Sequence, residues 1–156
     1  MFGKLNQEEM ISLLSRNIFG RIGCSDGKRT YVFPISYAFH NDTVYCYSRE
    51  GHKLSIMRDN PAVCFQADEV GDMANWKSVL GWGTFKELTD PTERRDAIRH
   101  LAERVLPLMS SETTHIFPHW PFPPDDLNEI EGVVFEIKIL ELTGRYERFQ
   151  RLASSI

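Results

Sequence analysis

The chain has 156 residues, of which 42% are hydrophobic and 26% are charged, with a formal net charge of −4. This length and composition indicate a single folded domain over residues 1–156 without long disordered segments, and the negative charge argues against general nucleic-acid binding. No run reaches the ~18 apolar residues of a membrane helix, and the first residues lack the apolar core of a signal peptide. We therefore expect a cytoplasmic protein that binds neither nucleic acid nor membranes.

The three cysteines are far apart, each within a strand-like segment, and form no CxxC pair: Cys24, Cys46 and Cys64. This pattern favours reduced thiols in the core over a catalytic thiol or a metal site. We expect no metal centre.

The N-terminal half of the chain predicts one helix followed by a meander of strands. Asn6 and Glu9 are spaced as a capping box, which predicts a helix from Asn6 to Arg16. The turn signals Asp26-Gly27 and Asn41-Asp42 separate three predicted strands. These strands are Phe19 to Ser25, Thr30 to His40 and Thr43 to Ser48. Because proline cannot donate to a sheet, Pro34 predicts an edge, a bulge or a split in the second strand.

The second half predicts two more helices and three more strands. A helix from about His52 to Asp59 ends at Asn60-Pro61, because the residue before a proline avoids the helical region. The remaining predicted elements are a strand from Ala62 to Ala67, a polar loop from Asp68 to Asn75, a strand from Trp76 to Leu88, a helix starting at Asp90-Pro91 and ending before Pro107, a long aromatic loop from Leu108 to Glu131, and a strand from Gly132 to Leu142. Six strands with three marginal helices favour a mainly β, α+β fold built on a small barrel; an open α+β sheet is the alternative.

The strongest functional signal is the stretch from Tyr31 to Asn60. Its hairpin leads through Ser48 and Gly51 to the cations His52 and Lys53 at the start of a helix. Helix N-termini and cations bind anions, and the hairpin offers a flat apolar wall beside them. This combination predicts a flavin mononucleotide (FMN) site; the alternative is an ordinary solvated first turn of a helix.

The ordered set of segments resembles the pyridoxamine 5′-phosphate oxidase-like FMN-binding split barrels, and is most similar to their 5-nitroimidazole-resistance, nitroreductase-like branch. The matching segments are Ser48-Arg49-Glu50-Gly51-His52-Lys53, the helix to Asn60-Pro61, the strand Val63 to Ala67, and Trp76 to Gly83. The resemblance covers nearly all of residues 5 to 143. It implies a six-stranded FMN-binding split β-barrel and a homodimer with two FMN molecules at the subunit interface.

The resemblance also assigns cofactor-binding roles to individual residues. It implies that Lys53 neutralises the flavin phosphate, with His52 and Ser48 beside it. The remaining assignments are Phe33, Pro34, Ile35 and Ser36 along the isoalloxazine edge, Tyr47 against the ribityl chain or the ring, and Trp76, Ser78 and Val79 near the flavin of the partner subunit or the phosphate side of the same one. Each of these residues has an alternative role in ordinary core or interface packing.

These features predict an FMN-dependent oxidoreductase that passes two electrons to a small planar acceptor such as a nitroaromatic, with NAD(P)H as a candidate donor. The C-terminal arginine-rich segment of the true oxidase is not found, which puts vitamin B6 oxidation in doubt. No side chain is required as a general acid, and His52 and His119 are the first candidates to test. His115, His119 and Trp120 are candidate active-site cover, or part of an ordinary surface loop.

Two alternatives belong to other functional classes. One is a haem- or flavin-binding carrier or sensor without turnover, for which four histidines are available ligands: His40, His100, His115 and His119. The other is a cofactor-free interaction module.

Overall fold

The computed structural model describes residues 1–105 and 130–149. Within these residues the chain forms one antiparallel sheet of seven strands and three helices. The elements are β1 (Phe2–Lys4), α1 (Gln7–Arg16), β2 (Phe19–Ser25), β3 (Thr30–His40), β4 (Thr43–Ser48), α2 (His52–Asp59), β5 (Ala62–Asp72), β6 (Asn75–Glu87), α3 (Pro91–Val105) and β7 (Val133–Glu147). The predicted mainly β fold with flanking helices is confirmed.

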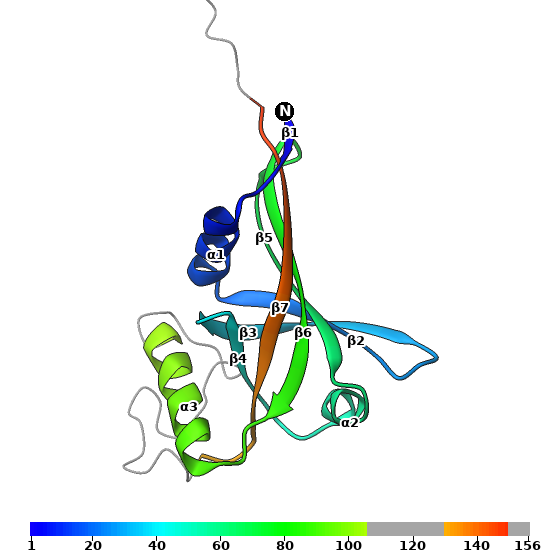
Figure 1. Cartoon of the computed structure of the whole chain (residues 1–156), viewed down its shortest axis with the longest axis vertical. Coiled ribbons are helices and arrows are strands. Elements are labelled where there is room, and N and C mark those ends of the chain that lie inside the picture. Colours follow the sequence, from blue (N-terminus) through cyan, green and yellow to red (C-terminus); the bar gives the residue numbers. More distant parts are fainter. Residues whose placement is uncertain (106–129, 150–156) are drawn as a thin grey trace, which may run out of the picture.

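The sheet closes into a barrel. Its strand order is β1-β7-β4-β3-β2-β5-β6, and β6 also pairs with β7, so all strands except β1 form a closed ring of six (Figure 1). The predicted six-stranded barrel is therefore confirmed, and the open sheet is wrong. The short strand β1, which the sequence patterns did not indicate, pairs with the C-terminal part of β7.

Local signals in the sequence produce the elements that were predicted from them. The Asn6 side chain accepts a hydrogen bond from the Glu9 amide at 2.9 Å, and the Glu9 carboxylate accepts one from the Asn6 amide at 2.8 Å, which completes the capping box. Asn41 and Asp42 have φ values of 48° and 56°, the left-handed backbone that a tight hairpin turn requires. These short-range interactions do not depend on the rest of the fold.

Strand β3 changes partner halfway along its length. Residues Thr30 to Ser36 pair with β2, whereas Tyr37 to His40 pair with β4. The amide of Tyr37 donates to Ile18 O at 3.0 Å, so the main-chain N–H and C=O of Tyr37 face β2. These groups point to opposite sides at successive residues of an antiparallel strand, so those of Val32 and Pro34 face away from β2. No described strand pairs with that edge, so of the three predicted alternatives at Pro34 the edge position is confirmed.

Strands β5, β6 and β7 run beyond the barrel as a long ribbon, with the N-terminus at its far end (Figure 1). The predicted polar loop from Asp68 to Asn75 is wrong, because β5 continues to Asp72 and pairs with β6. The predicted end of the last strand at Leu142 is also wrong, because β7 continues to Glu147 along β6 and β1. Acidic residues are tolerated in this part of β5 because they have partners: Asp68 pairs with Arg21 at 3.4 Å, and Glu69 pairs with Arg16 at 2.8 Å.

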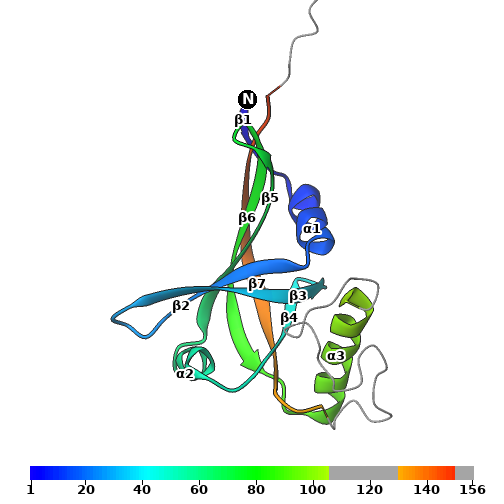
Figure 2. The same ribbon diagram turned by 180° about the vertical axis from the view of Figure 1, so that it is seen from behind.

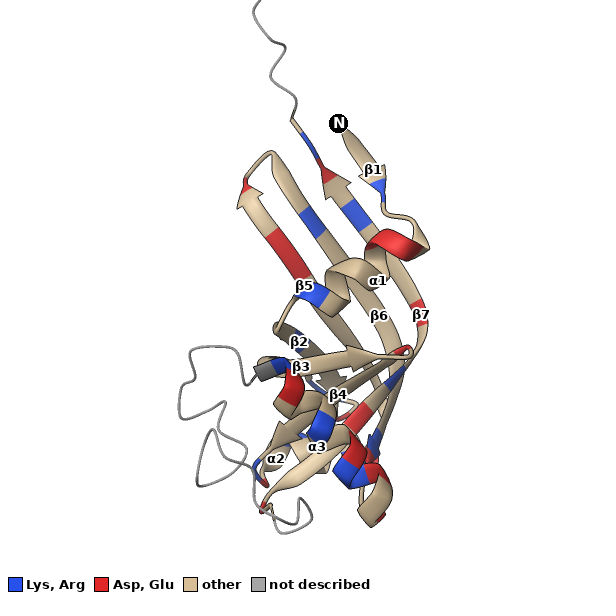
Figure 3. Ribbon diagram, turned by 90° about the vertical axis from the view of Figure 1, so that its left-hand side faces the viewer, with Lys and Arg blue, Asp and Glu red and all other residues tan. Residues whose placement is uncertain are grey.

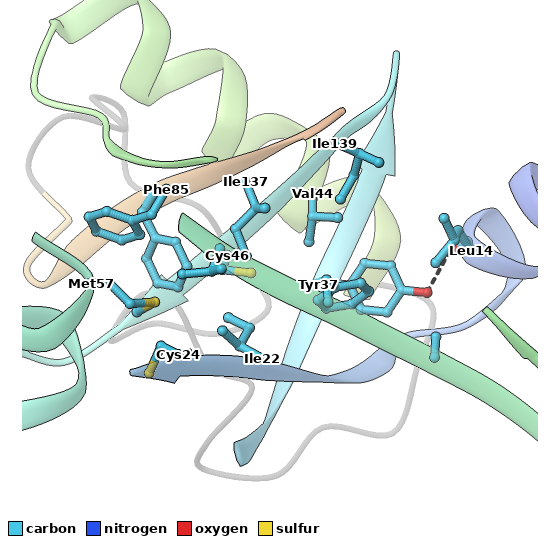
Figure 4. Packing of buried hydrophobic residues seen from close by; sticks show 14 of the residues in the cluster. Leu14, Ile22, Cys24, Tyr37, Val44, Cys46, Met57, Phe85, Ile137 and Ile139 are labelled. Atoms are coloured by element: carbon cyan, nitrogen blue, oxygen red, sulfur yellow. Dashed lines mark hydrogen bonds between the residues drawn. The ribbon is translucent and has the colours of Figure 1, made fainter. Parts of the chain in front are cut away.

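The main core fills the barrel and is closed at its ends by α1 and α2. Figure 4 shows residues from several strands pointing into this core, among them Tyr37, Cys46 and Ile137, none of which is exposed to solvent. The Tyr37 hydroxyl donates to Leu14 O at 2.6 Å, which satisfies its polar group inside the core. Cys24 and Cys46 are buried and Cys64 is half-buried, so the predicted core role of the cysteines holds for the first two.

Helices α2 and α3 lie on opposite sides of the barrel, which the view from behind also shows (Figure 2). The inward face of α3 (Ala97, Ile98, Leu101, Ala102) packs with Ala38 and Val134 in a second apolar cluster on the outside of the barrel. None of the described helices is long and apolar enough to cross a membrane.

Candidate functional site

The first turn of α2 packs against β3, as the predicted phosphate site requires. The Lys53 amino group lies 4.3 Å from the centre of the Phe33 ring, and the His52 ring contacts the Tyr31 ring edge-on at 5.9 Å. Tyr31 and Phe33 are on the same face of β3, two residues apart. Two successive helical residues are therefore held beside the half of β3 that β4 leaves unpaired.

The two basic side chains in this turn, His52 and Lys53, lack anionic partners in the described part of the chain. His52 and Lys53 are exposed, and within residues 1–105 and 130–149 neither forms an ion pair with a carboxylate. No side chain caps α2 at Gly51, and the first turn contains no acidic residue. Cations at a helix N-terminus oppose the helix dipole, so an anion bound there would relieve an unfavourable arrangement.

The unpaired edge of β3 supplies main-chain groups next to these cations. Val32 presents an N–H and a C=O to this edge, whereas Pro34 presents only a C=O. Ile35 and Phe33 point inward, Ile35 against the main core and Phe33 as part of it. Val32 and Pro34 can therefore offer one donor and two acceptors to a planar heterocycle, beside a helix N-terminus that suits its phosphate.

The adjacent hairpin residues Tyr47 and Ser48 have different surroundings. The Ser48 hydroxyl donates to Arg49 O at 3.0 Å, within the loop that leads to α2. The Tyr47 hydroxyl donates to Glu131 O at 2.7 Å, and its ring packs with the second cluster, beneath α3. The structure thus places Ser48 at the end of β4, opposite Val133 of β7 and before the loop that leads to α2, and places Tyr47 in the packing of the α3 side.

Trp76, Ser78 and Val79 are at the far end of β6 from α2. Strand β6 has 13 residues and spans roughly 40 Å, and its Glu87 end, not its Trp76 end, contacts Arg58 of α2. Trp76 donates from Nε1 to the Glu147 carboxylate at 3.0 Å, Ser78 accepts from Gln66 at 3.0 Å, and Val79 is fully buried. One chain therefore does not bring these three residues to Lys53.

An apolar row crosses the outer face of the sheet where no described helix covers it. Val32 lies opposite Gly23, Gly23 opposite Cys64, and Cys64 opposite Trp82. The side chains at the two ends of the row, Val32 and Trp82, are 70% and 42% exposed. An uncovered apolar row beside the unpaired edge of β3 is a surface that another protein surface can cover.

Two candidate histidines lie on the other side of the barrel. The His100 ring is stacked between His40, at 4.5 Å, and Tyr45, at 5.1 Å between ring centres. Burial lowers the pKa of His100, and the neighbouring His40 lowers it further. His115, His119 and Trp120 lie outside the described residues.

Arg58 borders this site but was not among the residues predicted from the sequence. It lies in the last turn of α2 and binds the carboxylates of both Glu50 and Glu87. Arg58 is eight residues from Glu50 and 29 from Glu87, and neither spacing is a recognisable sequence pattern.

A separate pocket of about 200 Å³ lies at the end of the β5–β6–β7 ribbon, lined by residues that include Glu69, Lys77 and Tyr146.

Comparison with known proteins agrees with this architecture. The sequence pattern of the pyridoxamine 5′-phosphate oxidase family matches residues 6–146. An uncharacterized protein of Rhizobium meliloti (strain 1021) is 26% identical over 148 residues, which cover 90% of this chain and 92% of that one.

Two solved structures share the fold. A FAD-binding protein from Mesorhizobium loti is 29% identical, with a TM-score of 0.72, and the match covers 94% of this chain and 98% of that one. A candidate 5-nitroimidazole antibiotic resistance protein from Bacteroides thetaiotaomicron is 18% identical, with a TM-score of 0.70, covering 94% of this chain and 87% of that one. The second likeness concerns the fold alone.

Proposed function

Because the chain belongs to the pyridoxamine 5′-phosphate oxidase family, we propose that it is a flavoprotein that binds FMN and passes electrons to a small acceptor. The observation that carries the proposal is a pair of basic side chains without anionic partners, His52 and Lys53, which contact the rings of Tyr31 and Phe33 on the half of β3 whose edge is unpaired. The FAD-binding relative from Mesorhizobium loti supports a flavin as the ligand class. We favour FMN because the cationic turn suits a terminal phosphate dianion.

The residues present fit such a cofactor. Lys53 and His52 would hold the phosphate together with the free N–H groups at the start of α2. Val32 and Pro34 would present main-chain groups to the ring edge, and the ring system would supply the redox chemistry when bound. The protein's own contribution is to orient the cofactor and to exclude water from one face of it.

A second copy of the chain would complete the site. Val32, Pro34, His52 and Lys53 are all exposed, whereas binding sites for small molecules bury most of the ligand surface. A homodimer formed through the outer row from Val32 to Trp82 would cover the ring and would bring Trp76 or Ser78 of one chain toward the flavin of the other. Sedimentation at low micromolar concentration tests this arrangement, and a stable monomer that binds FMN tightly would contradict it.

The reaction we propose is two-electron reduction of a small planar acceptor, such as a nitroaromatic, with NAD(P)H as the donor. An acceptor stacked on the open face of the ring would need no side-chain acid for electron transfer. His52 is the nearest described histidine to the site and is the first to substitute if proton delivery limits the rate.

The decisive test compares FMN with riboflavin, which lacks the phosphate. Lys53→Ala should weaken FMN binding by about 1.5–3 kcal/mol, at least tenfold, and should leave riboflavin binding unchanged. Titration of flavin fluorescence measures both affinities, and the spectrum of the purified protein establishes whether a flavin is carried at all. Lys28→Ala, in the exposed β2–β3 turn, is the matched control and should change neither affinity. Equal losses for FMN and riboflavin would rule out the phosphate site.

A further inference from the structure

Arg58 connects the loop in front of α2 to the end of β6. Its Nη2 lies 3.0 Å from Glu50 Oε2, and its Nη1 donates to the other Glu50 oxygen. Its Nε lies 2.9 Å from Glu87 Oε2, and its Nη2 lies 3.1 Å from Glu87 Oε1. Both carboxylates are therefore bound by two nitrogens each, the geometry that best fixes a guanidinium. The bond to Arg58 lowers the pKa of Glu50, so this carboxylate stays ionised.

Glu50 occupies a sensitive place in the chain. It directly precedes Gly51, where α2 begins, and it is the only acidic residue between Ser48 and Arg58. A free carboxylate at this point would be attracted to the same N–H groups and the same two basic side chains that would bind a phosphate. It would compete with the ligand from within the loop.

We propose that Arg58 is a positioning residue for the flavin phosphate. By binding Glu50, it keeps that carboxylate off the first turn of α2 and leaves His52 and Lys53 available to an external anion. Glu87, at the end of β6, fixes Arg58 to the barrel. This inference rests on the proposed FMN site, and it assigns a ligand-selecting role to a residue that does not touch the ligand.

Three variants test the inference through the affinities for FMN and riboflavin. Arg58→Gln frees Glu50 and should weaken FMN binding about five- to tenfold, while riboflavin binding changes less than about twofold. Glu50→Gln alone should bind FMN as the unmodified protein does. The double variant, Glu50→Gln with Arg58→Gln, should recover FMN affinity to within about twofold, because the competing charge is gone.

The controls separate positioning from loss of stability. Glu87→Gln keeps the Arg58–Glu50 pair and should leave FMN affinity unchanged, although it lowers the urea midpoint. Arg58→Gln and the double variant should have similar urea midpoints, so recovery of binding cannot come from recovered stability. Added salt should shrink the FMN defect of Arg58→Gln, since the competing charge is exposed.

The outcomes also distinguish this inference from the proposed function. If the unmodified protein binds FMN and riboflavin equally, the phosphate site itself is wrong. If it prefers FMN but the double variant binds FMN as poorly as Arg58→Gln, the phosphate site stands and the role of Arg58 is wrong.

Discussion

The α3 side and the α2 side of the barrel both carry histidine and tyrosine side chains, but the partners of these side chains differ. On the α3 side, the His100 ring is covered by His40 and Tyr45, and the Tyr47 hydroxyl has an acceptor in Glu131 O. Both acidic and basic residues lie on α3 (Figure 3). Nothing in this arrangement calls for a ligand, because each of these rings and hydroxyls has its partner within the chain.

On the α2 side, a histidine again meets a tyrosine, but His52 and Lys53 have no anionic partner in the described part of the chain. His52 contacts Tyr31 only edge-on, and Lys53 faces the Phe33 ring and forms no ion pair with a carboxylate in the described part of the chain. The edge of β3 beside them is unpaired. The comparison teaches that a histidine near a tyrosine says little about function, whereas unmatched charge beside unmatched main-chain groups indicates a binding site.

The largest expected effect comes from disrupting the strand that the two sides share. Ile35→Glu places a charge against the main core and should cost about 3 kcal/mol or more, which abolishes folding or flavin binding. Val32→Glu, on the outward face of the same strand, should leave a cooperatively folded protein. Urea unfolding followed by circular dichroism measures both. A soluble Ile35→Glu protein with unchanged FMN affinity would show that this strand does not line the site.

A second substitution affects the pairing of β6 with β7, which closes the barrel, rather than the α2 side or the α3 side. A Cβ atom at Gly83 would lie 2.3 Å from Lys138 O, next to the bulge where β7 carries an extra residue, Leu140. Gly83→Ala should therefore destabilise the protein by about 2 kcal/mol. A Cβ atom at Gly51 would meet nothing within 4 Å, so Gly51→Ala should stay within about 0.5 kcal/mol by urea unfolding. Equal costs would contradict this account.

A substitution at Tyr47 tests directly whether this residue belongs to the α3 side or to the flavin site. Tyr47→Phe removes the hydrogen bond to Glu131 O and should reduce the free energy of unfolding by about 1 kcal/mol. FMN affinity should not change, since the structure places this ring beneath α3. A tenfold loss of FMN affinity with unchanged stability would restore Tyr47 to the flavin site.

The smallest effect is a dependence of stability on pH that belongs to the α3 side. Burial and His40 lower the pKa of His100 below its ordinary value of 6.5, so the unfolded chain binds a proton at higher pH than the folded chain does. The stability due to neutral His100 is complete above about pH 6.5 and is lost as the pH falls through the lower folded-state pKa. The charged groups acting on it are Asp96, Arg99 and Glu103. Urea midpoints at pH 7.5 and 5.5 should differ less for His100→Gln than for the unmodified protein.

Features set by neighbouring residues were predictable from the sequence. The capping box of α1, the left-handed turn at Asn41-Asp42 and the start of α2 all depend on contacts within a few residues. Pro34 also acts locally, because its missing N–H restricts it to an edge, a bulge or a split in a sheet, and the fold then decides which of these it occupies. These local features predicted that the start of α2 lies beside β3, and the contact between Lys53 and the Phe33 ring shows that it does.

Features set by distant residues were not predictable. Charged residues in β5 suggested a loop, but pairing with β6 and with arginines on other elements makes that segment a strand. Tyr47 and Ser48 are adjacent in sequence, and only the packing of α3 assigns them to different sides. Arg58 depends on a partner 29 residues away, for which no local pattern exists.

The missing N–H of Pro34 has a consequence for the behaviour of the protein in a crowded solution. An unpaired strand edge is a template on which another chain can add a strand and begin to aggregate. A proline facing that edge removes one of the donors that an incoming strand would need, while its carbonyl still accepts from a small molecule. Pro34 therefore leaves β3 an open edge that the proposed flavin could use without offering a complete edge to another polypeptide.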